Sequence, residues 1–153
     1  MAAMSDYLEN KLIDHVFRGV SYTAPSGLYI GLLTAAPSDS GGGTEVGTSG
    51  TNYARASLAP STGNWAATNG ATTTTNPSSG TSGTTSNNSA ITFNAPSGGT
   101  NWGNITHVGV YDSATVGAGN LLFWCALTTP KNVNSGDAAP SFAISQLTFQ
   151  IDN

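Results

Sequence analysis

The apolar positions near the start of the chain recur with a helical period. Leu8, Leu12 and Val16 lie four residues apart, with Tyr7 and Ile13 beside them, which predicts one apolar stripe along an amphipathic helix. We expect this stripe to pack on the chain's own sheet. The alternative is that it docks on a neighbouring subunit, which would make Leu8, Leu12 and Val16 interface residues.

The ends of this helix are also marked in the sequence. Ser5-Asp6 starts it, and Asp6 with Glu9 three residues later has the spacing of a capping box. Arg18 followed by Gly19 is typical of a helix C-terminus, because glycine accepts the left-handed conformation that often follows a helix. We therefore predict a helix over about residues 5–18, and no other helix in the chain.

The pattern changes to that of β-strands after the helix. Residues 101–128 hold the most buryable surface of the chain, in two runs at 105–111 and 121–127. Small polar residues with two glycines separate the runs, which predicts a hairpin with a long loop. Because residues 121–127 are apolar on both faces, we expect them to form a central strand that is covered on both sides.

Shorter runs at residues 28–34, 53–58, 90–94 and 140–152 predict further strands between Gly- and Pro-rich segments. Short strands with such punctuation and one helix are typical of a mainly β fold, so we predict an antiparallel β-sandwich with one N-terminal amphipathic helix. A chain of 153 residues has the length of a single domain. The sandwich would occupy residues 20–153.

The C-terminal run changes phase in the middle. Phe142 and Ile144 fall on one face, whereas Leu147, Phe149 and Ile151 fall on the other. A β-bulge at residues 145–146 would let both halves face the same core, because it inserts one extra residue into the strand.

Residues 61–89 form a long Ser/Thr/Gly-rich insertion of 29 residues, with Trp65 near its start. A loop of this length is uncommon in a compact domain, and its composition offers little apolar surface for ordering itself. We expect it to be either mobile or an arm ordered by a neighbouring chain. Residues 72–75 are β-prone threonines that would extend a partner's sheet edge, and Pro77 would end that contact.

Charge is scarce and unevenly distributed. Only 8% of the residues are charged, and five of the twelve charges lie between Asp6 and Arg18. A polar but uncharged surface suits a protein held in an assembly better than a freely diffusing enzyme. The net charge of −4, with only four Lys and Arg, argues against a nucleic-acid partner. No apolar run approaches the roughly 20 residues of a membrane span, and charges interrupt the first apolar stretch, so we expect no membrane partner and no secretory signal.

Candidate chemistry is weak throughout the chain. A Cys125–His107 nucleophile pair would lack an orienting group, and a His107–Asp112 metal pair would lack a third ligand. Gly41-Gly42-Gly43 precedes no helix and no Lys, so it does not predict a phosphate-binding loop. We therefore predict no catalytic, cofactor-binding or metal site, and a buried structural role for Cys125.

Two tryptophans follow asparagine in the sequence, Trp65 and Trp102. Either indole could stack on a sugar, but we expect them to be anchors in the core or at an interface. No pair of carboxylates supports a carbohydrate-active enzyme.

The chain resembles a family of small tailed-bacteriophage virion proteins. The resemblance is carried by SDYLENK at residues 5–11, LYIGL with TAAP at 28–37, NWG with THVGVYD at 101–112, and GNLLF at 119–123. It covers nearly the whole chain except residues 61–89. Members of the family are identified as capsid decoration (cement) proteins or as tail-fibre-like proteins.

The resemblance implies a non-enzymatic virion structural protein, assembled in the host cytoplasm. Our first expectation is a capsid decoration protein, a homotrimer bound to the outer shell where major capsid protein subunits meet. The alternative is a tail, baseplate or tail-fibre component whose partners are tail proteins, with receptor binding as one role. The resemblance carries no catalytic residue and no cofactor.

Overall fold

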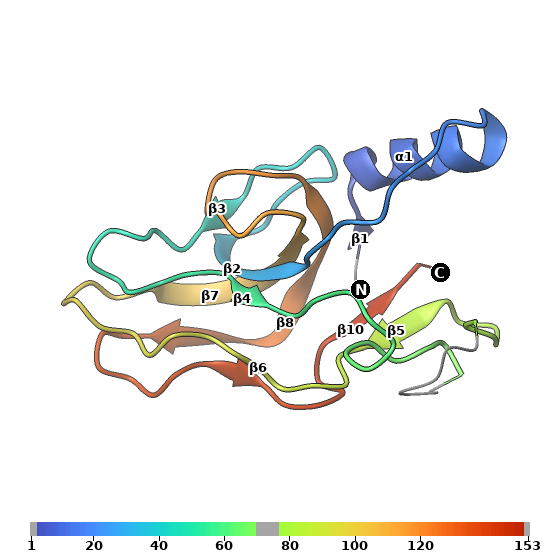
Figure 1. The fold of residues 1–153 in the computed structure, drawn as a ribbon. Helices are drawn as coiled ribbons and strands as arrows, with labels where there is room; N and C mark the ends of the chain where they lie inside the picture. Colours follow the sequence, from blue (N-terminus) through green and yellow to red (C-terminus); the bar gives the residue numbers. More distant parts are fainter. Residues whose placement is uncertain (1–2, 70–76, 152–153) are drawn as a thin grey trace.

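The computed structural model describes residues 3–69 and 77–151, which form a mainly β fold with antiparallel strand pairing (Figure 1). The predicted antiparallel β-sandwich with one helix near the N-terminus is confirmed. Its elements in chain order are β1 (Ala3–Met4), α1 (Asp6–Phe17), β2 (Tyr29–Ala35), β3 (Thr44–Glu45), β4 (Ala56–Ser57), β5 (Thr84–Ser86), β6 (Ile91–Thr92), β7 (Gly103–Tyr111), β8 (Leu121–Val133), β9 (Ser141–Phe142) and β10 (Thr148–Gln150).

The main sheet has the strand order β1-β8-β7-β2-β3 in the described part of the chain, and β4 also pairs with β2. β7 and β8 form the predicted hairpin, with Val108 opposite Cys125. β2 lies on the other side of β7, with Gly31 opposite Gly109. β3 was not expected, because it lies in a segment of Gly, Ser and Thr that resembles a loop.

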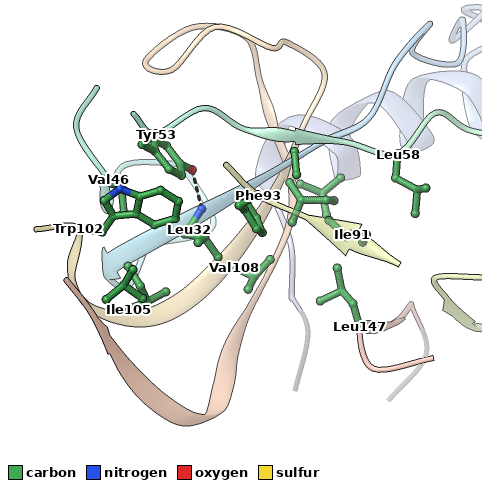
Figure 2. Close-up of a cluster of buried hydrophobic side chains, with 14 of the residues drawn as sticks. Leu32, Val46, Tyr53, Leu58, Ile91, Phe93, Trp102, Ile105, Val108 and Leu147 are labelled. Carbon is green, nitrogen blue, oxygen red and sulfur yellow. Dashed lines mark hydrogen bonds between the residues drawn. The ribbon is translucent and has the colours of Figure 1, made fainter. Parts of the chain in front are cut away.

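The second layer consists of two short pairs, β6 with β9 and β10 with β5, which lie across one face of the main sheet (Figure 1). The core fills the space between the layers, and Figure 2 shows the aromatic and aliphatic side chains that meet there. The rings of Tyr53 and Trp102 pack edge to face with centroids 5.1 Å apart, and Tyr53 Oη accepts a 2.8 Å hydrogen bond from the backbone N–H of Leu32. Two more buried residues, Ile91 and Phe93, come from β6 and the residue after it.

β8 is longer and less enclosed than the sequence predicted. Its first residues, Leu121 and Leu122, are buried, but Cys125 is half-buried and Ala126 is exposed. The expectation that residues 121–127 are covered on both sides was wrong for the second half, where Leu127 is also only half-buried. β2 and β7 are the most enclosed of the described strands, each with four consecutive buried residues.

α1 has the predicted bounds, but its cap is Ser5 and not Asp6. Ser5 Oγ accepts a 3.4 Å hydrogen bond from the backbone N–H of Leu8, the third helical residue. The same residue anchors the helix to β8. Its N–H donates to the carbonyl of Leu122 at 3.0 Å, and its hydroxyl donates to the carbonyl of Leu121.

The described parts of the insertion, residues 61–69 and 77–89, are ordered by this chain's own residues. β5 pairs with β10, and the fully buried Asn87 donates from Nδ2 to the carbonyls of Ser89 and Ala143. Asn87 Oδ1 also accepts from the N–H of Leu147 at 2.9 Å. The expectation that only a neighbouring chain could order this insertion was therefore wrong for these residues. The threonines at 72–75 lie outside the described residues.

The phase change near the C-terminus lies where the sequence predicted it, but it is a turn and not a bulge. Ser145 adopts a left-handed conformation with φ 63°, and the N–H of Gln146 donates to the carbonyl of Ala143 at 3.1 Å. The turn separates β9 from β10, which pair with different strands. It lets Leu147 face the core but leaves Ile144 60% exposed.

Candidate interaction surfaces

A buried ion pair lies on the face of the main sheet that points away from the core. Arg55 and Glu45 form a bidentate pair with nitrogen–oxygen distances of 2.8 and 2.7 Å, and their side chains are only 1% and 11% exposed. Arg55 Nη1 also donates to the carbonyls of Ser113 and Ala118 at 2.7 and 3.0 Å. One guanidinium therefore ties the β7–β8 loop to β3, a role that no local sequence pattern around Arg55 predicts.

Two glycines make room for this ion pair. The guanidinium carbon of Arg55 lies 3.6 Å from the ring centroid of Tyr111, a cation–π contact. A Cβ on either Gly31 or Gly109 would come within 2.8 Å of Tyr111 Cε2. We call Gly31, Gly109, Tyr111, Arg55 and Glu45 the arginine stack. Its glycines are required because they lack a side chain.

An open cleft of about 620 Å³ adjoins the arginine stack, between the loop at residues 39–44 and the loop at 116–120. Four of the five N–H donor positions of Arg55 are used inside the protein, and Glu45 is paired with it. The described residues contain no group of three or more His, Cys, Asp or Glu side chains that could hold a metal ion. What this arrangement does physically is fix the β7–β8 loop to β3.

Two tyrosines beside the ion pair give the fold a pH dependence. Burial, followed by the negative charge of Glu45, raises the pKa of Tyr53, and the same two causes raise the pKa of Tyr111 to about 12. The unfolded chain releases these protons near pH 10 whereas the folded chain keeps them, so stability is fully present below about pH 10 and is lost as the pH rises further. We expect the urea midpoint, followed by circular dichroism, to fall above about pH 10.

Tyr53→Phe provides the control for this alkaline effect, because it removes one of the two titrating hydroxyls. The variant should be less stable at neutral pH, since it loses the hydrogen bonds to Leu32 and Glu45. Its urea midpoint should fall less steeply with pH than that of the wild type. Equal slopes in the two proteins would contradict a contribution from Tyr53.

The residues of the candidate nucleophile pair and the candidate metal pair, His107, Cys125 and Asp112, lie in separate places. His107 is opposite Ala126 and Cys125 is opposite Val108, so the two side chains project from opposite faces of the sheet. His107 Nδ1 lies 2.8 Å from the Thr106 hydroxyl, and burial raises the pKa of the Cys125 thiol. At the far end of β7, Asp112 accepts hydrogen bonds from the backbone and side-chain N–H groups of Asn120.

The C-terminal part of α1 and the residues just after it carry exposed apolar side chains. Ile13, Val16, Phe17 and Val20 are 51%, 65%, 81% and 51% exposed. Ile13, Val16 and Phe17 have the spacing i, i+3 and i+4 of helices that dock into grooves, whereas Val20 follows the end of the helix, beyond Gly19 with φ 69°. We call these four residues the helix face. α1 projects beyond the end of the sheet (Figure 1), so this face is free to meet another molecule.

A second apolar surface lies between the main sheet and the β10–β5 pair. It is an open hollow of about 260 Å³, which we call the aromatic hollow, and its lining is Leu28, Pro60, Ser61, Trp65, Thr85, Val110, Leu122, Phe123 and Phe149. The ring of Phe149 lies 5.7 Å from that of Phe123 and 6.3 Å from that of Trp65. The two hydroxyl groups have partners within the chain: Ser61 Oγ accepts from the N–H of Asn64, and Thr85 Oγ1 donates to the carbonyl of Ala66.

The structure places the five candidate interface residues differently. Leu8 is buried, Leu12 is half-buried and Val16 is on the helix face. Trp65 is half-buried in the wall of the aromatic hollow, whereas Trp102 is a core residue whose Nε1 donates to the carbonyl of Thr51 at 2.7 Å. Their part in a contact with another chain stays a prediction.

The stripe of α1 also differs from the one predicted. Leu8 packs on the body as expected, but Val16 belongs to the separate helix face. Phe17 and Val20 were not singled out, although the spacing of residues 13, 16, 17 and 20 is visible in the sequence. α1 thus has one buried apolar side and one exposed apolar side. Predicting a single apolar stripe from the sequence does not distinguish the two.

Comparison with known protein families gives a match that covers nearly the whole chain. A family model described as Podophage GP4 fiber I protein gp80 matches residues 3–150. No curated protein matches the chain significantly in sequence. Among the described residues, no helix combines the length and the apolar character needed to cross a membrane.

Proposed function

The chain belongs to the podophage GP4 fiber I protein gp80 family, a family of phage structural proteins, and from this membership we propose that it is a non-enzymatic subunit of a phage tail fibre. The observation that carries the proposal is the extent of the match, from residue 3 to residue 150. The span includes every segment on which the sequence resemblance rests.

The surface of the chain supports a role in an assembly. Only seven of its charged residues lie outside α1 and its cap, so most of the body would be weakly protected by charge against association. The helix face and the aromatic hollow are two apolar surfaces of the kind that mark contacts between proteins. The arginine stack holds the β7–β8 loop against the sheet, which favours a rigid building block over a flexible adaptor.

Capsid decoration, our first expectation from the sequence, is the second candidate. It shares the virion location and the assembly role, but the family description names a fibre and so favours the tail. A capsid decoration protein would bind the major capsid protein, whereas a tail-fibre subunit would bind other tail proteins. A homotrimer fits either location and is part of the proposal in both.

The location in the virion tests the proposal directly. Purified particles would be labelled with antibody against this chain and viewed by electron microscopy, while quantitative mass spectrometry measures its copy number relative to the major capsid protein. We expect label on the tail and a copy number far below that of the shell protein. Label over the whole shell, with hundreds of copies per particle, would replace the fibre proposal with capsid decoration.

A further inference from the structure

The helix face and the aromatic hollow both lack an occupant among residues 3–69 and 77–151, which the structure describes. None of the four helix-face residues lines the hollow, and α1 projects away from the body while the hollow lies between the main sheet and the β10–β5 pair (Figure 1). The chain therefore presents a protruding apolar element and an open apolar recess at the same time. Each needs a partner that the single chain does not supply.

The two surfaces agree in size. A cavity of about 150 Å³ is large enough to hold benzene, so a hollow of about 260 Å³ has room for a phenyl ring and part of an aliphatic side chain. Phe17 is the most exposed of the large hydrophobic side chains described, at 81%, and Val16 lies next to it. These two side chains are what a recess of this volume accommodates.

The two surfaces also agree in chemistry. Trp65, Phe123 and Phe149 form the wall of the hollow, and aromatic rings in such a wall favour a further ring packed edge to face. No lining residue is charged, and both lining hydroxyls have partners within the chain. On α1, the charged pair of Asp14 and Arg18 is already satisfied at 3.2 Å. Neither surface selects a charged ligand or a polar one.

We propose that the helix face of one copy docks in the aromatic hollow of a second copy, with Phe17 as the anchor. This inference rests on the proposed role as a repeated subunit, which keeps identical copies at high local concentration. The contact is head-to-tail, because it joins two different surfaces of the same chain. Each copy then gives its helix to one neighbour and receives the helix of another, and a rotation that closes produces a ring such as a trimer.

The first test compares three single variants by sedimentation velocity. Phe17→Ser removes the anchor, and Ser61→Arg places a charged side chain at the hollow, where Ser61 is exposed. Ile144→Ser is the matched control, because Ile144 is 60% exposed but belongs to neither surface. We expect wild type and Ile144→Ser to associate at micromolar concentration. Phe17→Ser and Ser61→Arg should each weaken association at least tenfold, with unchanged circular dichroism spectra.

The second test mixes the two weakened variants. Ser61→Arg keeps an intact helix and Phe17→Ser keeps an intact hollow, so an equal mixture can form one good contact. We expect a heterodimer of twice the 15.4 kDa chain mass, which cannot grow further because both of its remaining surfaces are altered. Neither variant alone should form this species at the same concentration.

Several results would overturn the inference. A wild-type protein that stays monomeric up to about 100 µM would overturn the inference, because copies joined by a repeated interface should associate well below that concentration. Loss of association in Phe17→Ser but not in Ser61→Arg would mean that the helix face docks elsewhere, for example on a second helix face. A mixture that stays monomeric would exclude head-to-tail docking. Because these measurements use purified protein, they are independent of where antibody labels the virion.

Discussion

Replacing Arg55 with methionine should lower the free energy of unfolding by about 3–5 kcal/mol, as expected when one partner of a buried ion pair is removed. The substitution leaves the carboxylate of Glu45 in a site where its side chain is only 11% exposed. It also removes the donors to the carbonyls of Ser113 and Ala118, so the β7–β8 loop loses its attachment. Urea denaturation followed by circular dichroism measures the change.

Two controls separate the ion pair from other effects of this substitution. Arg18→Met breaks the Asp14–Arg18 pair, whose side chains are 36% and 70% exposed, and should cost less than about 1 kcal/mol. The double variant Arg55→Met with Glu45→Met should recover part of the loss, because no unpaired carboxylate remains. A double variant as unstable as the single one would mean that the loop contacts, and not the ion pair, dominate.

Gly109→Ala should destabilise the protein by about 1–3 kcal/mol, the usual cost of overpacking. The added Cβ would lie 2.8 Å from Tyr111 Cε2 and 3.0 Å from Leu121 Cδ1. Neither group can retreat easily, because the ring lies between the sheet and Arg55 and both side chains are buried. The melting temperature, measured by calorimetry, should fall accordingly.

Gly47→Ala is the matched control for this overpacking. A Cβ at Gly47 would meet no atom within 4 Å, and Gly47 does not have a positive φ. The control should therefore leave stability unchanged or raise it slightly, since alanine restricts the unfolded chain. A further variant, Gly109→Ala with Tyr111→Leu, should lose less stability than the sum of its two single changes, because the clash and the ring disappear together. Strict additivity would contradict the proposed steric cause.

The elements that could be predicted are those whose signal is local. The helix has its cap, its apolar stripe and its terminal glycine within 15 residues of sequence. The β7–β8 hairpin likewise shows as two apolar runs with a polar segment between them. β5 could not be predicted in this way, because Thr84 and Thr85 have the composition of a loop. Their partner, β10, lies more than 60 residues further along the chain.

The arginine stack was missed for a related reason. Its members come from β2, β3, the residue before β4, and β7, and only the paired register of Gly31 and Gly109 brings them together. A lone arginine in a short strand usually faces solvent, so Arg55 gave no sign of burial. Of the residues predicted to lie at an interface, Val16 is on the helix face and Trp65 lines the aromatic hollow, and their part in a contact with another chain stays a prediction. The exposure of Phe17 depends on the angle at which the helix leaves the sheet, which the sequence does not encode locally.

The attachment of Ser5 to β8 makes the position of α1 depend on a distant part of the sequence. Ser5 hydrogen-bonds the carbonyls of Leu121 and Leu122, so the attachment of α1 to β8 joins residues more than 110 positions apart, whereas the N–H of Asp6 reaches only the carbonyl of Asp39 at 2.8 Å. The hollow depends on a residue still further along the chain, because Phe149 forms part of its wall. Long-range pairing of this kind forms slowly. The β8 attachment of α1 and the wall of the hollow therefore both depend on residues synthesised more than 110 positions after Ser5, and both reach their final geometry late in folding.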